Sequence, residues 1–127
     1  MAAGGDAPHL PNPAPIDAYG NGGFRFAGMS HRGSLLCLPD GIWAWPVNSA
    51  QEITEAALQP IFDRADMLDL LLIGAGRDPF ALPVPLRERF RALNISVDCL
   101  TTGAAAQTYN ILLGEKRRVA AGLVAVE

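Results

Sequence analysis

Leu70-Leu71-Leu72-Ile73-Gly74-Ala75-Gly76 is an apolar run that breaks into glycines. An apolar run without alternation is typical of a strand buried on both faces, as in the centre of a helix-covered sheet. Glycines let the chain leave such a strand sharply, and open α/β sheets bind their ligands at these strand ends. The stretch therefore predicts an α/β protein with a central strand at 70–73 and a loop at 74–78.

The chain around this strand alternates between helical and extended patterns. Leu86, Phe90 and Leu93 recur at the spacing i, i+4 and i+7, which is typical of one face of a helix. Pro60 must kink or divide the preceding helix, because its ring does not fit a regular helix interior. Helices are therefore expected at 53–62, 86–93 and 102–114, and strands at 70–73, 96–100 and 119–126.

The helix at 102–114 carries its own end signals. Thr102 is expected to cap its start, and Gly114 is expected to end it. Tyr109 falls on the apolar face, so we expect it in the core with its hydroxyl group hydrogen-bonded. Asn110 is expected to bind a neighbouring loop, since buried amides need partners.

The first third of the chain is expected to be antiparallel. Pro39-Asp40-Gly41 separates the apolar runs 35–38 and 42–45 with the spacing and the turn residues of a β-hairpin. Phe24-Arg25-Phe26 alternates as an outer strand does. These segments indicate strands that are added to the sheet before the alternation of helices and strands begins.

Together the patterns predict a single compact three-layer α/β domain at 15–127. It has a central mixed β-sheet with packed helices and an added N-terminal antiparallel hairpin. Residues 1–14 are rich in Ala, Gly and Pro, so we expect them to form a flexible leader. This leader lacks the basic and apolar segments of a signal peptide, which favours a cytoplasmic protein.

Composition and charge limit the functions to consider. Of the 127 residues, 50% are apolar and 18% are charged, which suits one folded core. The net charge of −3 and the solvated turn expected at Lys116-Arg117-Arg118 exclude nucleic acid as an expected partner. No apolar run approaches the roughly 20 residues that span a bilayer, so no direct membrane insertion is expected.

The two cysteines indicate no metal site. Cys37 and Cys99 lie far apart, without a Cys-x-x-Cys motif or a histidine at ligand spacing. Both are interpreted as small buried hydrophobic residues. The sequence therefore predicts neither a metal nor another cofactor.

The glycine loop matches nucleotide-binding loops only in part. A dinucleotide site needs three glycines in the pattern G-x-G-x-x-G, and Pro79 stands at the third position. A P-loop is also excluded, because no G-K-[ST] follows. Gly74 and Gly76 are therefore interpreted first as residues that let the chain leave a buried strand.

A small ligand site is still predicted at this edge of the sheet. If the strands at 70–73 and 96–100 are parallel, the loops that follow them emerge side by side. Main-chain N–H groups at a helix start and a nearby arginine would then hold a small anion or a carboxylate. The candidate ligand-binding residues are Gly74, Gly76, Arg77, Thr101 and Thr102.

Catalytic groups are sparse. His9 lies in the leader, and His31 lies in a predicted loop with no nucleophile beside it. Ser30 and Ser34 are interpreted as polar loop residues. No catalytic residue is assigned, so an enzyme is possible in principle but has no support in the sequence.

Motifs along the chain after the leader carry a family resemblance. They are Tyr19-Gly20, Gly23 to Arg25, Trp43, Leu71 to Gly76, Ala105 to Asn110, Leu112 to Glu115 and Arg117 to Ala121. Their order is similar to that in the small uncharacterised domain family that includes mitochondrial respiratory complex I assembly factor three. This resemblance implies a compact three-layer α/β domain. Ala106 stands where many relatives have Cys, and Gln107 where bacterial members often have Arg, so thiol chemistry is not available at that point.

Two functional hypotheses follow. The leading one, implied by the resemblance, is a non-enzymatic cytoplasmic domain that binds a protein partner, as an assembly factor does. The alternative is a small-molecule or anion-binding domain, with or without catalysis. It would use a cleft between the loops at 74–78 and 101–103.

Overall fold

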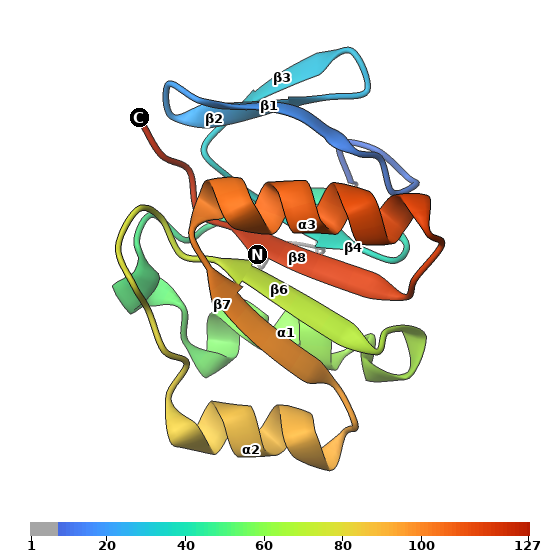
Figure 1. The fold of residues 1–127 in the computed structure, drawn as a ribbon, viewed down its shortest axis with the longest axis vertical. Helices are drawn as coiled ribbons and strands as arrows, with labels where there is room; N and C mark the ends of the chain where they lie inside the picture. The colour runs from blue at the N-terminus through green and yellow to red at the C-terminus, as the bar shows by residue number, and fades with distance from the viewer. Residues whose placement is uncertain (1–7) are drawn as a thin grey trace.

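The computed structural model describes residues 8–127 as two β-sheets and three α-helices (Figure 1). The larger sheet has the strand order β5 (Gly41–Trp45), β4 (Ser34–Leu38), β8 (Val119–Leu123), β6 (Leu70–Gly74) and β7 (Ser96–Leu100). The smaller sheet contains β1 (Ile16–Gly20), β2 (Gly23–Phe26) and β3 (Met29–Arg32). The helices are α1 (Glu55–Phe62), α2 (Val84–Ala92) and α3 (Thr102–Gly114), with short 3-10 turns at Ala50–Glu52 and Ala65–Met67.

The larger sheet is mixed, as predicted. β6 runs parallel to both of its neighbours, β7 and β8, whereas β4 runs antiparallel to β5 and β8. The predicted hairpin at 35–38 and 42–45 is the pair β4 and β5. The last strand of the chain, β8, therefore joins the N-terminal hairpin to the parallel half of the sheet.

The helices cover both faces of this sheet (Figure 1). Leu58 of α1 and Phe90 of α2 belong to one apolar cluster, on one face of the sheet. Tyr109 of α3 belongs to a second cluster, which it shares with Phe24 and Phe26 of the small sheet. The α/β architecture is thus confirmed, with α1 and α2 on one face and α3 and the small sheet on the other.

The central strand β6 contacts both clusters. Leu71 and Ile73 point into the cluster of α1 and α2, Leu72 points into the cluster of α3, and all three are completely buried. A strand in this position needs apolar side chains on both faces, which explains its lack of alternation.

Small residues in β8 make room for large neighbours. A Cβ atom on Gly122 would lie 2.7 Å from Cη2 of Trp45, so only glycine fits beneath the indole ring. The indole Nε1 donates a hydrogen bond to the carbonyl oxygen of Ala57 at 3.0 Å. Trp45 is therefore held between β8 and α1.

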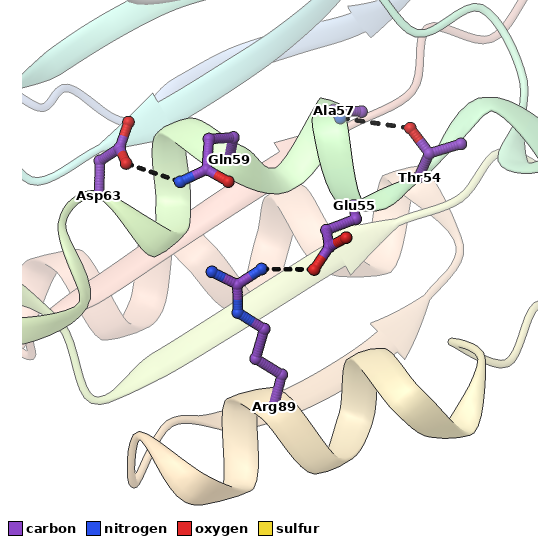
Figure 2. A network of polar contacts seen from close by, with 6 residues as sticks. All are labelled: Thr54, Glu55, Ala57, Gln59, Asp63 and Arg89. Carbon is purple, nitrogen blue, oxygen red and sulfur yellow. Dashed lines mark hydrogen bonds and ion pairs between the residues drawn. The ribbon is translucent and has the colours of Figure 1, made fainter.

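Polar contacts link α1 to α2 (Figure 2). The Arg89 guanidinium group binds the Glu55 carboxylate at 2.6 Å and lies over the ring of Phe62, 3.7 Å from its centroid. Thr54 caps the start of α1 by accepting a hydrogen bond from the Ala57 N–H group. Pro60 lies inside α1 without dividing it, and the helix ends at Phe62.

The small sheet differs from the prediction in one strand. β2 is its middle strand and not an outer one, because β3 forms where a loop with Ser30 and His31 was expected. Ala27 and Gly28 both have positive φ, at 51° and 74°, and so form the tight turn that a hairpin needs. This turn lacks the Asn-Gly or Asp-Gly pair that marks such turns in a sequence.

Several local predictions are also corrected. Thr101 caps α3, whereas Thr102 is the first residue of the helix. Leu93 is 41% exposed, because α2 ends at Ala92 and the chain leaves the helical path there. The last strand ends at Leu123 and not at 126, and Ser34 is a buried residue of β4.

Two strand edges are covered by other parts of the chain. The His9 N–H group donates to the Ile42 carbonyl at 2.8 Å, and the Ile42 N–H group donates to Leu10. Asn110 of α3 exchanges two side-chain hydrogen bonds with the main chain of Ile16, each 2.7 Å long.

Residues 1–7 of the predicted leader lie outside the described residues, and the boundary at 14 stays a prediction. No helix in the described part of the chain is long and apolar enough to cross a membrane.

We expect Gly122→Ala to lower the free energy of unfolding by about 1–3 kcal/mol, because its methyl group overlaps the Trp45 ring. Gly114→Ala is a matched control, since nothing lies within 4 Å of the corresponding position in α3. Alanine is favoured in a helix, so the control should raise the free energy of unfolding by up to about 1 kcal/mol. Urea denaturation measures both changes, and changes of the same sign would contradict the packing argument.

Candidate functional site

The loops after β6 and β7 emerge side by side. In the parallel pairing of the two strands Gly74 lies opposite Leu100. The Ala75 N–H group donates to the Leu100 carbonyl, and the Thr102 N–H group donates to the Gly76 carbonyl, both at 2.9 Å. The structure therefore brings Gly74, Gly76 and Thr102 together at one edge of the sheet.

The two glycines of the loop have different roles. A Cβ atom on Gly74 would lie 2.9 Å from Cα of Thr102, so glycine allows α3 to lie close to β6. Gly76 has open space around it but adopts a φ of 100°, which residues with a side chain rarely adopt. One glycine therefore serves packing and the other serves the turn.

The Thr102 hydroxyl group is completely buried and joins three segments of the chain. It donates its one proton to the Val124 carbonyl at 2.6 Å, and the Gly74 carbonyl, at 3.2 Å, is a second and longer acceptor. It also accepts a hydrogen bond from the Gly76 N–H group at 3.0 Å. Its hydrogen-bonding capacity is thus used within the fold.

The remaining candidate side chains also bind the chain itself. The Thr101 hydroxyl accepts a hydrogen bond from the Ala104 N–H group at 3.4 Å. The exposed guanidinium group of Arg77 donates to the main-chain carbonyl of Glu127. An anion at this loop would have to replace such internal bonds, and its binding stays a prediction.

A groove beside α3 carries no signal in the sequence. It has a volume of about 550 Å³ and is lined by β1 and by the first turns of α3. Tyr19 is 53% exposed in its wall, and its hydroxyl oxygen lies over Gly103, where a Cβ atom would come within 2.3 Å. The walls come from opposite ends of the chain, so no local pattern could have predicted the groove.

Cys37 and Tyr109 form a buried polar pair in the core below α3. Burial raises the pKa of the Cys37 thiol to about 12, although the side-chain hydrogen bond with Tyr109 acts in the opposite direction. Burial, followed by the neighbouring thiol, also raises the pKa of Tyr109. Both groups are therefore neutral at ordinary pH, and Tyr109 is a core residue, as expected.

The polar groups considered for catalysis have structural partners. Nε2 of His31 lies 3.1 Å from the Ser34 carbonyl, and its ring centroid lies 4.7 Å from that of His9. Desolvation lowers the pKa of His31, against the effect of this hydrogen bond. The Ser34 hydroxyl donates to Val47 and accepts from Ala125. Within residues 8–127 no cluster of His, Cys, Asp or Glu could hold a metal ion.

We expect Thr102→Val to lower the free energy of unfolding by about 2–3 kcal/mol, because it leaves the Val124 carbonyl without its buried donor and the half-buried Gly76 N–H group without its acceptor. Thr101→Val is the control, since it removes only the helix cap and should cost about 1 kcal/mol. Urea denaturation and hydrogen exchange at the Gly76 amide test this difference. Unchanged protection of that amide in Thr102→Val would contradict the proposed role of the hydroxyl.

The pair in the core predicts a loss of stability in alkali. The folded chain keeps the Cys37 proton up to a pH near 12, whereas the unfolded chain releases it near 9. Between these pH values the folded state holds one proton more than the unfolded state, so the free energy of unfolding falls as the pH rises from 9 toward 12. Each such group contributes a slope of about 1.4 kcal/mol per pH unit in that interval. Denaturant titrations at several pH values should give a shallower slope for Cys37→Ala. Equal slopes for both proteins would contradict the assignment.

Curated relatives match nearly the whole chain. An uncharacterised protein of Rhodobacter capsulatus is 41% identical over 110 residues, which cover 87% of this chain and 83% of the relative. NADH dehydrogenase [ubiquinone] 1 alpha subcomplex assembly factor 3 of mouse is 28% identical over 91% of this chain. The match covers 62% of the length of the mouse protein.

Solved structures share the fold. A Bartonella henselae protein described as an outer membrane protein superposes with a TM-score of 0.90 at 48% identity, over 94% of this chain and 100% of that chain. A Rhodopseudomonas palustris protein superposes with a TM-score of 0.84 at 52% identity, over 99% of this chain and 93% of that one. A family model described as "Protein of unknown function (DUF498/DUF598)" matches residues 16–124. The chain therefore belongs to the DUF498/DUF598 family, as the resemblance implied.

Proposed function

We propose that this chain is a non-enzymatic, cytoplasmic protein-binding module with an assembly-factor-like role. The observation that carries the proposal is the similarity to the mouse assembly factor, which extends over 91% of this chain. The family model spans residues 16–124, which include both sheets and the three described α-helices. What we propose for this chain is protein binding of the kind an assembly factor performs, without a named partner. The partners of the mouse protein are not transferred, because the chain spans 62% of its length.

The polar groups of the candidate site support a structural use of these residues. Thr102 joins three segments, Ser34 joins β4 to the chain at Val47 and Ala125, and Asn110 joins α3 to β1. Buried polar groups bonded in this way hold the main chain in place. A module that presents a fixed surface to a partner needs this kind of rigidity.

The described surface favours contacts through polar and main-chain groups. Its exposed large apolar side chains come from β1, the second 3-10 turn, the start of α2, the residue after α2 and the last turn of α3. They are Tyr19, Met67, Val84, Leu93 and Ile111. Single exposed apolar residues are ordinary on a protein surface. A partner that docks on this domain would therefore depend on charge and hydrogen bonding.

Affinity capture tests the proposal. The tagged chain is incubated in a lysate of Rhodobacter capsulatus, because a 41% identical relative comes from that organism. We expect saturable recovery of a defined protein, and an excess of the untagged chain should compete it away. The same tag on an unrelated acidic domain controls for charge alone.

A different pair of results would favour the ligand hypothesis. Recovery of nothing but the chain itself would contradict the proposed function. Saturable binding of a small anion that is lost in Arg77→Ala but kept in Arg117→Ala would then support a ligand site at the glycine loop. Both variants remove one positive charge, so a difference in anion binding between them reflects the position of the arginine and not the net charge.

A further inference from the structure

β7 is an edge strand of the larger sheet, and no described segment adds a main-chain hydrogen bond to its outer side. The outer edge of β5 is bonded at Ile42 by His9 and Leu10, and the edge of β1 is bonded at Ile16 by Asn110. The other edge strand of the small sheet, β3, pairs with β2 only. β7 pairs with β6 on one side only and is the outermost strand of its sheet in Figure 1. An unpaired strand edge is a template for another extended segment.

The register of β7 shows which main-chain groups face outward. The Ser96 N–H group donates to the Asp69 carbonyl, and the Leu100 carbonyl accepts from Ala75, so residues 96, 98 and 100 face β6. The alternate residues, Val97 and Cys99, then direct their N–H and C=O groups to the open edge. Within residues 8–127 no main-chain partner bonds these groups.

Two arginines of α2 lie beside this edge. Arg87 and Arg91 are one helical turn apart and line a groove of about 500 Å³ together with Ser96 and Val97 at the start of β7. Arg91 is 81% exposed, and its contact with Glu88 is 4.0 Å long. Arg87 forms no ion pair within the described residues. Arg89, by contrast, points toward α1 and binds Glu55 (Figure 2).

The opposite face of β7 carries a negative charge. The side chains of Val97 and Cys99 pack toward α2, so the alternate residue Asp98 points to the other face, where it is exposed. An added strand would place every second side chain beside the arginines and the others beside Asp98. Acidic residues would be favoured at the first set of positions and disfavoured at the second.

We propose that the open edge of β7 binds an extended segment of a partner protein that carries acidic residues at every second position. This proposal rests on the proposed function and names the chemistry of the partner. The main-chain groups of Val97 and Cys99 supply hydrogen bonds that are independent of sequence, and Arg87 and Arg91 supply the preference for acids. A second copy of this chain is a poorer occupant. Antiparallel pairing of two β7 strands would bring the arginines of both α2 helices to one face of a continuous sheet, where their like charges repel.

A synthetic peptide tests the proposal directly. The probe is a fluorescent, end-capped peptide with the sequence Glu-Val-Glu-Val-Glu-Val, titrated with the full chain and followed by anisotropy. We expect saturable binding that weakens with added salt, and slower hydrogen exchange at the Val97 and Cys99 amides. A peptide of the same composition with its glutamates in one block should bind at least about tenfold more weakly, since it cannot place them all on one face.

Charge-reversal variants locate the site. The double variant R87E/R91E should weaken peptide binding by about tenfold or more, because it replaces two attractions by two repulsions. The double variant R25E/R32E makes the same change in charge on the small sheet and should leave binding within about twofold of the original. Urea denaturation shows whether each variant is folded. Val97→Pro removes an outward N–H group from the edge of β7, so it should also weaken peptide binding.

Several results would overturn the proposal. They are absence of saturable peptide binding, equal effects of the two double variants, protection of β3 amides in place of those of β7, and a concentration-dependent dimer that protects the β7 amides without peptide.

Capture with the R87E/R91E variant as bait separates this proposal from the proposed function. A protein recovered equally well by this bait and by the original chain overturns the β7 site and leaves the proposed function standing. Failure of the original chain to recover any protein overturns the proposed function.

Discussion

The hydroxyl group of Thr102 holds the ends of β6 and β8 against the first turn of α3. Val124 adds a main-chain bond to Gly74 at 2.8 Å, so the same corner is closed by main chain and side chain together. Because no water reaches a completely buried hydroxyl, each bond lost there would leave a polar group unpaired. The course of the glycine loop and of the segment after β8 both follow from this corner. The glycine loop at 74–78, which resembles a ligand-binding loop in the sequence, therefore first connects β6 to β8 and α3.

The remaining polar side chains follow the same logic at the edges of the sheets. Asn110 binds the N–H and C=O groups of Ile16 as a neighbouring strand would, and so completes the edge of β1 from a helix. His9 and Leu10 do the same for Ile42 in β5. Strand edges attract other chains unless something covers them, and β7 has no such cover along Val97 and Cys99.

Local patterns were enough to predict the elements whose burial is set by their own sequence. The unbroken apolar run of β6 and the Pro-Asp-Gly turn between β4 and β5 are of this kind. β3 was missed because the turn before it uses Ala27 and Gly28, and alanine rarely adopts a positive φ. Thr101 and Thr102 could not be told apart, since the choice of cap depends on which threonine the strands β6 and β8 bury. The bonds of Ser34 to Val47 and Ala125, and the groove between Tyr19 and Gly103, join segments distant in the chain.

The place of β8 has a consequence for the order in which the chain can fold. Strands β4 and β5 share no pairing with β6 and β7 except through β8, the last strand in the sequence. A nascent chain that has not yet exposed residues 119–123 outside the ribosome would hold two unjoined half-sheets, each with a bare apolar edge. Pairing across such distances is slow, and unjoined edges favour aggregation. During synthesis the two halves would thus stay exposed to aggregation until residues 119–123 emerge and insert between them.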